Sequence, residues 1–133
     1  MLKALELVTH QPTVLIVDDF AAVRRMLALQ FEGSGYRVIE AEDGFDALEL
    51  INCEHVDLVL TDICMPGLDG LELVRAVREL SPKTPVVVMT GAGALAAMAG
   101  RSVRPLETYV DAVCLKPFQA GDVIEVVRGL VAA

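Results

Sequence analysis

The chain has 133 residues, which suits one folded domain and leaves no room for a second. Its formal charge of −8, from 19 acidic and 11 basic residues without a basic cluster, argues against direct binding to a nucleic-acid backbone. The apolar runs are far too short to cross a bilayer, and the first ten residues lack the features of a signal peptide, so we expect a soluble cytoplasmic protein without membrane insertion.

Residues 1–12 form a polar lead-in, and residues 13–131 carry a repeating pattern of short apolar runs and longer segments with helical periodicity. The apolar runs lack polar alternation, which is typical of strands that are buried on both faces of a parallel sheet. The pattern predicts five strands, at residues 14–17, 36–41, 56–60, 86–89 and 112–115.

Apolar stripes with helical spacing lie between or after these strands. Their members are Val23, Met26 and Leu27; Leu73, Val74 and Val77; and Val123, Val126, Val127 and Leu130. Asp69 with Glu72 reads as the capped start of the third helix, and residues 33–35 (GSG) should end the first. Strand and helix alternate five times, which predicts a single α/β domain with a doubly wound parallel sheet and helices on both faces.

Acidic residues stand at the ends of two predicted strands. Asp18 and Asp19 follow the first strand, and Asp62 follows the third. In a flavodoxin-like strand order 2-1-3-4-5, the first and third strands are neighbours, so the three carboxylates would meet. Three like charges at short range should raise the pKa of a carboxyl or recruit a cation. Mg²⁺ suits such a site because it binds one or two carboxylates, keeps several waters and leaves room for a phosphate oxygen.

Two other strand ends carry polar groups, the hydroxyl of Thr90 and the ammonium of Lys116. Each feature is a weak signal by itself, but together they supply what an acyl-phosphate site needs. Asp62 would be the nucleophile, Lys116 and the metal would neutralise the phosphoryl oxygens, and Thr90 would donate a hydrogen bond to one of them.

Four motifs stand in this order at the predicted strand ends: VLIVDD, DICMPGLDG, VVVMTG and LKPF. With them, residues 13–131 resemble a response regulator receiver domain of bacterial two-component signalling, of the chemotaxis-regulator type. The resemblance implies that Asp62 is the phosphorylated aspartate, and that Asp18 and Asp19 serve Mg²⁺. It further implies that the backbone carbonyl of Cys64 is a metal ligand.

By the same resemblance, Thr90 is the switch hydroxyl, and Lys116 contacts the phosphoryl group and precedes a cis peptide bond to Pro117. The resemblance also implies a sensor histidine kinase or a phosphotransfer protein as donor, and a downstream protein partner that binds the surface of residues 91–131.

The sequence departs from the receiver pattern near its output region. Receiver domains usually carry an aromatic residue three positions before the lysine, and this chain has Val113 there. The segment between Thr90 and Lys116 is also longer than usual and rich in glycine and alanine. Our hypothesis is that phosphorylation orders or shifts residues 91–109, and the competing interpretation is a loose loop without a role in switching.

Two other functions are compatible with an aspartate at a strand end. An aspartate-nucleophile phosphatase of the haloacid dehalogenase type needs D-x-D after its first strand, and VDDFAA does not supply it. A receiver that serves only for docking usually lacks the aspartate or the lysine, and both are present. The sequence leaves open whether the chain acts alone or belongs to a hybrid kinase or a longer regulator.

Overall fold

The computed structural model describes residues 11–91, 93 and 109–133. Their centre is a parallel five-stranded sheet with the order β2-β1-β3-β4-β5. This is the strand order that the sequence predicts. The strands are β1 (Thr13–Val17), β2 (Arg37–Ala41), β3 (Leu58–Asp62), β4 (Val86–Thr90) and β5 (Ala112–Leu115).

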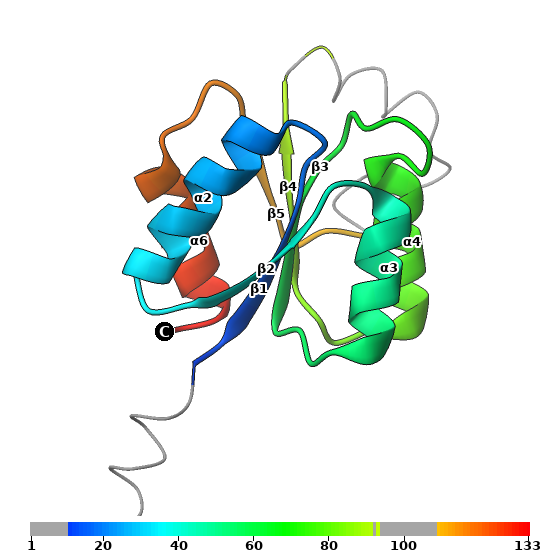
Figure 1. Ribbon diagram of the computed structural model, residues 1–133, viewed down its shortest axis with the longest axis horizontal. Coiled ribbons are helices and arrows are strands. Elements are labelled where there is room, and N and C mark those ends of the chain that lie inside the picture. The colour runs from blue at the N-terminus through cyan, green and yellow to red at the C-terminus, as the bar shows by residue number, and fades with distance from the viewer. Residues whose placement is uncertain (1–10, 92, 94–108) are drawn as a thin grey trace, which may run out of the picture.

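Helices cover both faces of the sheet (Figure 1). The bounds of the described helices are α2 (Ala21–Gly33), α3 (Gly44–Cys53), α4 (Gly70–Leu80) and α6 (Ala120–Leu130). On one face, α2 and α6 pack against residues such as Ile16 and Leu60, and on the other face α3 and α4 pack against residues such as Leu15 and Val59. Every residue of β1, β3 and β4 is buried, because these central strands are covered from both sides.

Two central strands end later than their apolar runs predict: β3 spans Leu58–Asp62 instead of residues 56–60, so it also begins two residues later, and β4 gains Thr90. Asp62 and Thr90 are the last residues of β3 and β4, and Asp62 pairs with Met89 in the sheet. The ladder even continues one residue past Asp62, where the amide of Ile63 donates to the carbonyl of Met89 at 3.2 Å. The two polar residues are therefore held by strand pairing and not by flexible loops.

The predicted apolar stripes of the first and last helices are wrong in part. Met26 is 41% exposed and Leu130 is 39% exposed, although both were expected to face the core. The buried faces consist of Leu27, Ala28 and Phe31 in α2, and Val123, Ile124 and Val127 in α6. Spacing alone does not fix how a helix is rotated against a sheet, since adjacent apolar residues allow more than one stripe.

The predicted helix ends agree with the structure. Asp69 is the N-cap of α4, and its carboxylate accepts a hydrogen bond from the backbone amide of Glu72 at 3.0 Å. α2 ends at Gly33, and Gly35 has φ of +97°, a conformation that favours glycine. No helix within the described ranges is long and apolar enough to span a membrane.

Candidate functional site

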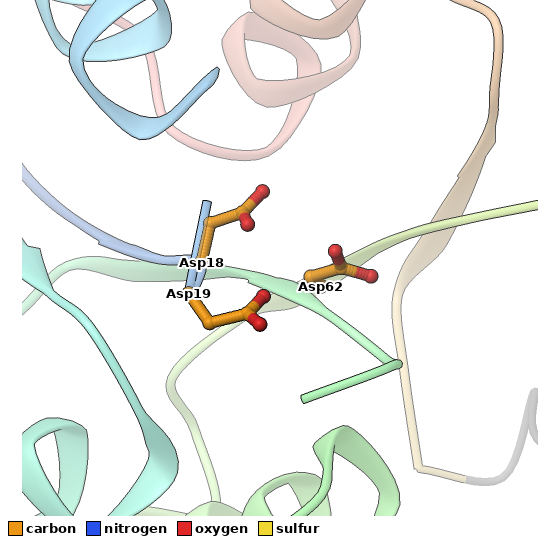
Figure 2. Close-up of side chains that lie close together, drawn as sticks. All are labelled: Asp18, Asp19 and Asp62. Carbon is orange, nitrogen blue, oxygen red and sulfur yellow. The ribbon is translucent and has the colours of Figure 1, made fainter. Parts of the chain in front are cut away.

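Three carboxylates meet at the carboxyl edge of the sheet. Asp18 and Asp19 follow β1, Asp62 ends β3, and one oxygen of each lies within 4.8 Å of the others. Figure 2 shows the carboxyl groups of Asp18 and Asp19 turned toward the side on which Asp62 lies. Asp18 and Asp62 are buried, whereas Asp19 is exposed. The sequence predicts this convergence, and the pairing of β1 with β3 produces it.

Asp18 is held at its backbone amide and at one of its two carboxylate oxygens. Its Oδ1 accepts a hydrogen bond from the amide of Phe20 at 2.9 Å, while its own amide donates to the carbonyl of Ala41 at 3.2 Å. Among the described residues, its Oδ2 is the one buried side-chain polar atom without a hydrogen-bond partner. Burial raises the pKa of Asp18, the Phe20 amide opposes this, and the charge of Asp62 raises it further.

These groups fit a hard divalent cation. A buried carboxylate oxygen without a partner is costly, and here it belongs to a cluster that contains two more carboxylates. Mg²⁺ favours oxygen ligands of this kind. Asp18, Asp19 and Asp62 are therefore the residues that would hold the ion.

Asp62 is held through both of its carboxylate oxygens. Lys116 Nζ donates to Oδ2 at 2.9 Å, and the backbone amide of Cys64 donates to Oδ1 at 3.2 Å. The amide of Lys116 donates to the carbonyl of Thr90 at 2.8 Å, so the lysine follows β5 at the same edge of the sheet. The peptide bond between Lys116 and Pro117 is cis, which confirms the expectation for this bond.

The hydroxyl of Thr90 lies at this edge as well. Thr90 is 1% exposed, and its Oγ1 donates to the carbonyl of Gly91 at 3.2 Å. The structure thus brings Thr90, Lys116 and the three acids to adjacent strand ends. Cys64 lies in the loop after β3 with its side chain exposed, so its backbone is the part that contacts Asp62.

Two residues near the acids escape the sequence analysis. Arg24 donates from Nη1 to the backbone carbonyl of Asp18 at 2.7 Å. Gly70 lies against the end of β3, because a Cβ atom there would come within 2.5 Å of the carbonyl oxygen of Asp62 and of Ile63 Cα. The D-G pair in DICMPGLDG was the available signal for Gly70, whereas the sequence holds no signal for the Arg24 contact.

The region between β4 and β5 is described only in part. Val113, at the position of the usual aromatic residue, is half-buried and packs against the core cluster beneath α3 and α4. Tyr109 packs against the same cluster, and its ring lies 5.6 Å from the Arg75 guanidinium carbon. The hypothesis about residues 91–109 concerns mainly residues 92 and 94–108, which lie outside the described residues.

The raised pKa of Asp18 predicts how the stability of the metal-free protein depends on pH. Between the unfolded and the folded pKa, the folded state binds more protons, so stability falls as pH rises through this window and stays reduced above it. We expect Asp18→Asn to increase the free energy of unfolding at pH 7 without Mg²⁺, because it removes a buried charge. The advantage should shrink as pH falls through the folded pKa.

Urea unfolding between pH 4 and pH 8, with and without Mg²⁺, measures this effect. Mg²⁺ at about 100 times its Kd should stabilise the parent by about 2.7 kcal/mol, and the variant by less. If Asp18→Asn is less stable than the parent at pH 7 without Mg²⁺, burial of the charged Asp18 carboxylate does not destabilise the folded protein.

The sequence of this chain is similar to those of many known proteins. Residues 14–128 match the family model described as the response regulator receiver domain. The chain is 35% identical over 122 residues to the transcriptional regulatory protein ResD of Bacillus subtilis, covering 92% of this chain and 49% of that protein. It is 38% identical over 104 residues to the sensor histidine kinase RcsC of Escherichia coli, covering 78% of this chain and 10% of that protein. The chain thus spans about half or less of these relatives.

Solved structures show the same fold. A putative response regulator from Chloroflexus aurantiacus superposes with a TM-score of 0.80 at 32% identity, covering 93% of this chain and all of that one. The response regulator TrrA of Thermotoga maritima, solved in complex with Mg²⁺ and BeF, gives a TM-score of 0.79 at 26% identity, covering 91% of this chain and 100% of that one.

Proposed function

Because this chain belongs to the response regulator receiver domain family, we propose that Asp62 is the residue on which it accepts a phosphoryl group in two-component signalling. The observation that carries this assignment is the position of the Asp62 carboxylate. It ends a buried central strand, 2.9 Å from Lys116 Nζ and beside two further acids. A reactive carboxylate held by strand pairing, with a cation at one oxygen, is preorganised for attack on phosphorus.

In the proposed transfer, a carboxylate oxygen of Asp62 forms a bond to the phosphorus of a phosphohistidine. The bond between phosphorus and the imidazole nitrogen breaks, and the nitrogen keeps that electron pair. Lys116 neutralises charge on the phosphoryl oxygens, and the hydroxyl of Thr90 turns from the Gly91 carbonyl to donate a hydrogen bond to one of them.

Mg²⁺ is the cofactor that we propose for this site. Asp18, Asp19 and Asp62 would hold it, and the backbone carbonyl of Cys64 is a further candidate ligand. When bound, Mg²⁺ supplies positive charge next to the phosphoryl oxygens. The protein's own part is to place the acids close together and to keep Lys116 at Asp62.

We further propose a sensor histidine kinase or a phosphotransfer protein as the phosphoryl donor, in the cytoplasm. The relatives include a transcriptional regulator and a sensor kinase, so both a regulator and a hybrid kinase are compatible contexts for residues 13–131. The downstream partner would bind the surface of residues 91–131, which lies partly outside the described residues. We expect no steady turnover of small phosphate esters, and such turnover would favour the phosphatase alternative.

Beryllofluoride, a mimic of the phosphoryl group, tests the proposal directly. We expect it to shift the backbone amide NMR signals of Asp62, Thr90 and Lys116 only when Mg²⁺ is present, because the acids and the mimic together carry too much negative charge without the cation. Binding of beryllofluoride in the absence of metal would contradict the proposed metal site. Absence of binding with Mg²⁺ present would contradict the phospho-acceptor assignment.

A further inference from the structure

Arg24 links the acidic loop to the neighbouring strand. It lies in the first turn of α2, and its side chain is 17% exposed. Its Nη1 donates to the backbone carbonyl of Asp18 at 2.7 Å, and its Nε donates to Glu40 Oε1 at 3.2 Å. Glu40 belongs to β2, next to β1, so one guanidinium group connects the start of a helix, the loop after β1 and the edge strand.

The carbonyl that Arg24 holds lies just beyond the sheet. The ladder between β1 and β2 ends at the pair Val17 and Ala41, so the carbonyl of Asp18 follows the last paired residue. The amide and Oδ1 of Asp18 are held by Ala41 and Phe20, respectively. Arg24 therefore holds the carbonyl of Asp18, the backbone group of this residue that strand pairing does not hold.

This carbonyl matters because it belongs to the peptide unit between Asp18 and Asp19. In a regular strand, consecutive side chains point to opposite faces of the sheet. Here both carboxylates lie with that of Asp62 inside 4.8 Å, so the chain must turn between the two acids. Because a peptide unit is planar, fixing this carbonyl oxygen fixes the plane of the peptide. The plane in turn sets the direction of the chain at Asp19.

We propose that Arg24 is a positioning residue for divalent-cation binding, which it supports by orienting the peptide between Asp18 and Asp19. This inference rests on the proposed function, from which it takes Mg²⁺ as the ion. The structure gives Arg24 hydrogen bonds to a backbone carbonyl and to Glu40, and its effect runs through the backbone of Asp18.

An effect of charge and an effect of positioning predict opposite changes in Mg²⁺ affinity when Arg24 is removed. If the Arg24 cation acted only by charge, its removal would strengthen the binding of Mg²⁺ to the acids. If it orients the peptide, its removal weakens binding. Arg25 is the matched control, because its Nη1 donates to the same Glu40 at 2.6 Å, it carries the same charge, and it is 58% exposed.

The experiment is a Mg²⁺ titration of the full chain without any phosphoryl donor, followed by the amide NMR signals of the loop after β1. We expect Arg24→Ala to raise the Kd for Mg²⁺ about tenfold or more, the size typical for residues that orient metal ligands. Arg25→Ala should leave the Kd within about threefold of the parent or lower it. Arg24→Lys should give an intermediate Kd. The guanidinium of Arg24 contacts Glu40 and the Asp18 carbonyl through two separate nitrogens, whereas lysine offers a single ammonium group.

Equal Mg²⁺ affinity in Arg24→Ala and Arg25→Ala, or tighter binding in Arg24→Ala, would overturn the inference. Urea unfolding of both variants checks that they are folded. Should Arg24→Ala fail to fold, the pair Arg24→Lys and Arg25→Lys carries the same comparison, and equal affinities again reject the positioning role. A parent protein that does not bind Mg²⁺ would instead reject the proposed metal site, so the two failures are distinguishable.

Discussion

Asp62→Asn should reduce phosphorylation by acetyl phosphate or a phosphorylated kinase by at least about a thousandfold, or about 4 kcal/mol in the activation barrier. The amide that replaces the carboxylate is a poor nucleophile and cannot form the acyl phosphate. The fold should persist, because the lost ion pair with Lys116 joins a partner that is 37% exposed. Intact mass spectrometry, which detects one added phosphoryl group, provides the measurement.

Asp46→Asn is the matched control for this experiment. Asp46 lies exposed in the first turn of α3, and its replacement removes the same charge at a distance from the three-acid cluster. The control should be phosphorylated at the parent rate. If Asp62→Asn also accepts a phosphoryl group at the parent rate, another residue is the acceptor and the assignment is wrong.

Gly70→Ala should impair both the stability and the site. A Cβ at this position would meet the carbonyl oxygen of Asp62 and Ile63 Cα at 2.5 Å, and these are backbone atoms that cannot rotate away. The amide of Gly70 also donates to the Ile63 carbonyl at 2.9 Å, which fixes the start of α4 against the end of β3. Overpacking of this kind typically costs about 1–3 kcal/mol. Urea unfolding reports the loss, and phosphorylation should slow because Asp62 must move.

Gly121→Ala provides the comparison for Gly70→Ala. Gly121 also lies in the first turn of a helix, α6, but a Cβ there would meet nothing within 4 Å. Alanine should therefore be neutral or stabilise by up to about 1 kcal/mol. A Gly70→Ala protein with the same stability and phosphorylation rate as the Gly121→Ala protein would show that β3 and α4 can separate without consequence.

The parallel sheet was accessible from the sequence, and the convergence of the acids followed once the flavodoxin-like strand order was assumed. Fully apolar runs such as residues 14–17 and 86–89 have few alternatives to buried parallel strands, and a parallel sheet brings its strand ends together. The ends of the strands were less accessible. β3 reaches Asp62 because β4 pairs with it there, and such pairing depends on the partner strand as much as on local hydrophobicity.

Contacts made across the fold were not accessible. The approach of Gly70 to Asp62 depends on how α4 packs on the sheet, and the contact of Arg24 with the Asp18 carbonyl depends on where β2 places Glu40. The exposure of Met26 has the same origin, since the neighbours of a helix decide which apolar residues it buries. The sequence shows how such residues are spaced along the chain, but not which parts of the folded protein they contact.

The hydrogen bonds that continue past the ends of the strands bear on how freely the Asp62 carboxylate moves. Ile63 donates to Met89 just after Asp62, and Lys116 donates to Thr90 just after β5. Both bonds end on β4, a central strand, so we expect the backbone just after Asp62 to open together with the sheet rather than to fray separately. We therefore expect the Asp62 end of β3 to share the lifetime of the whole folded domain, with amide exchange of Ile63 as slow as global unfolding as the signature. For the acyl phosphate proposed at Asp62, we therefore expect hydrolysis to be paced by how water reaches the phosphorus, and not by opening of β3.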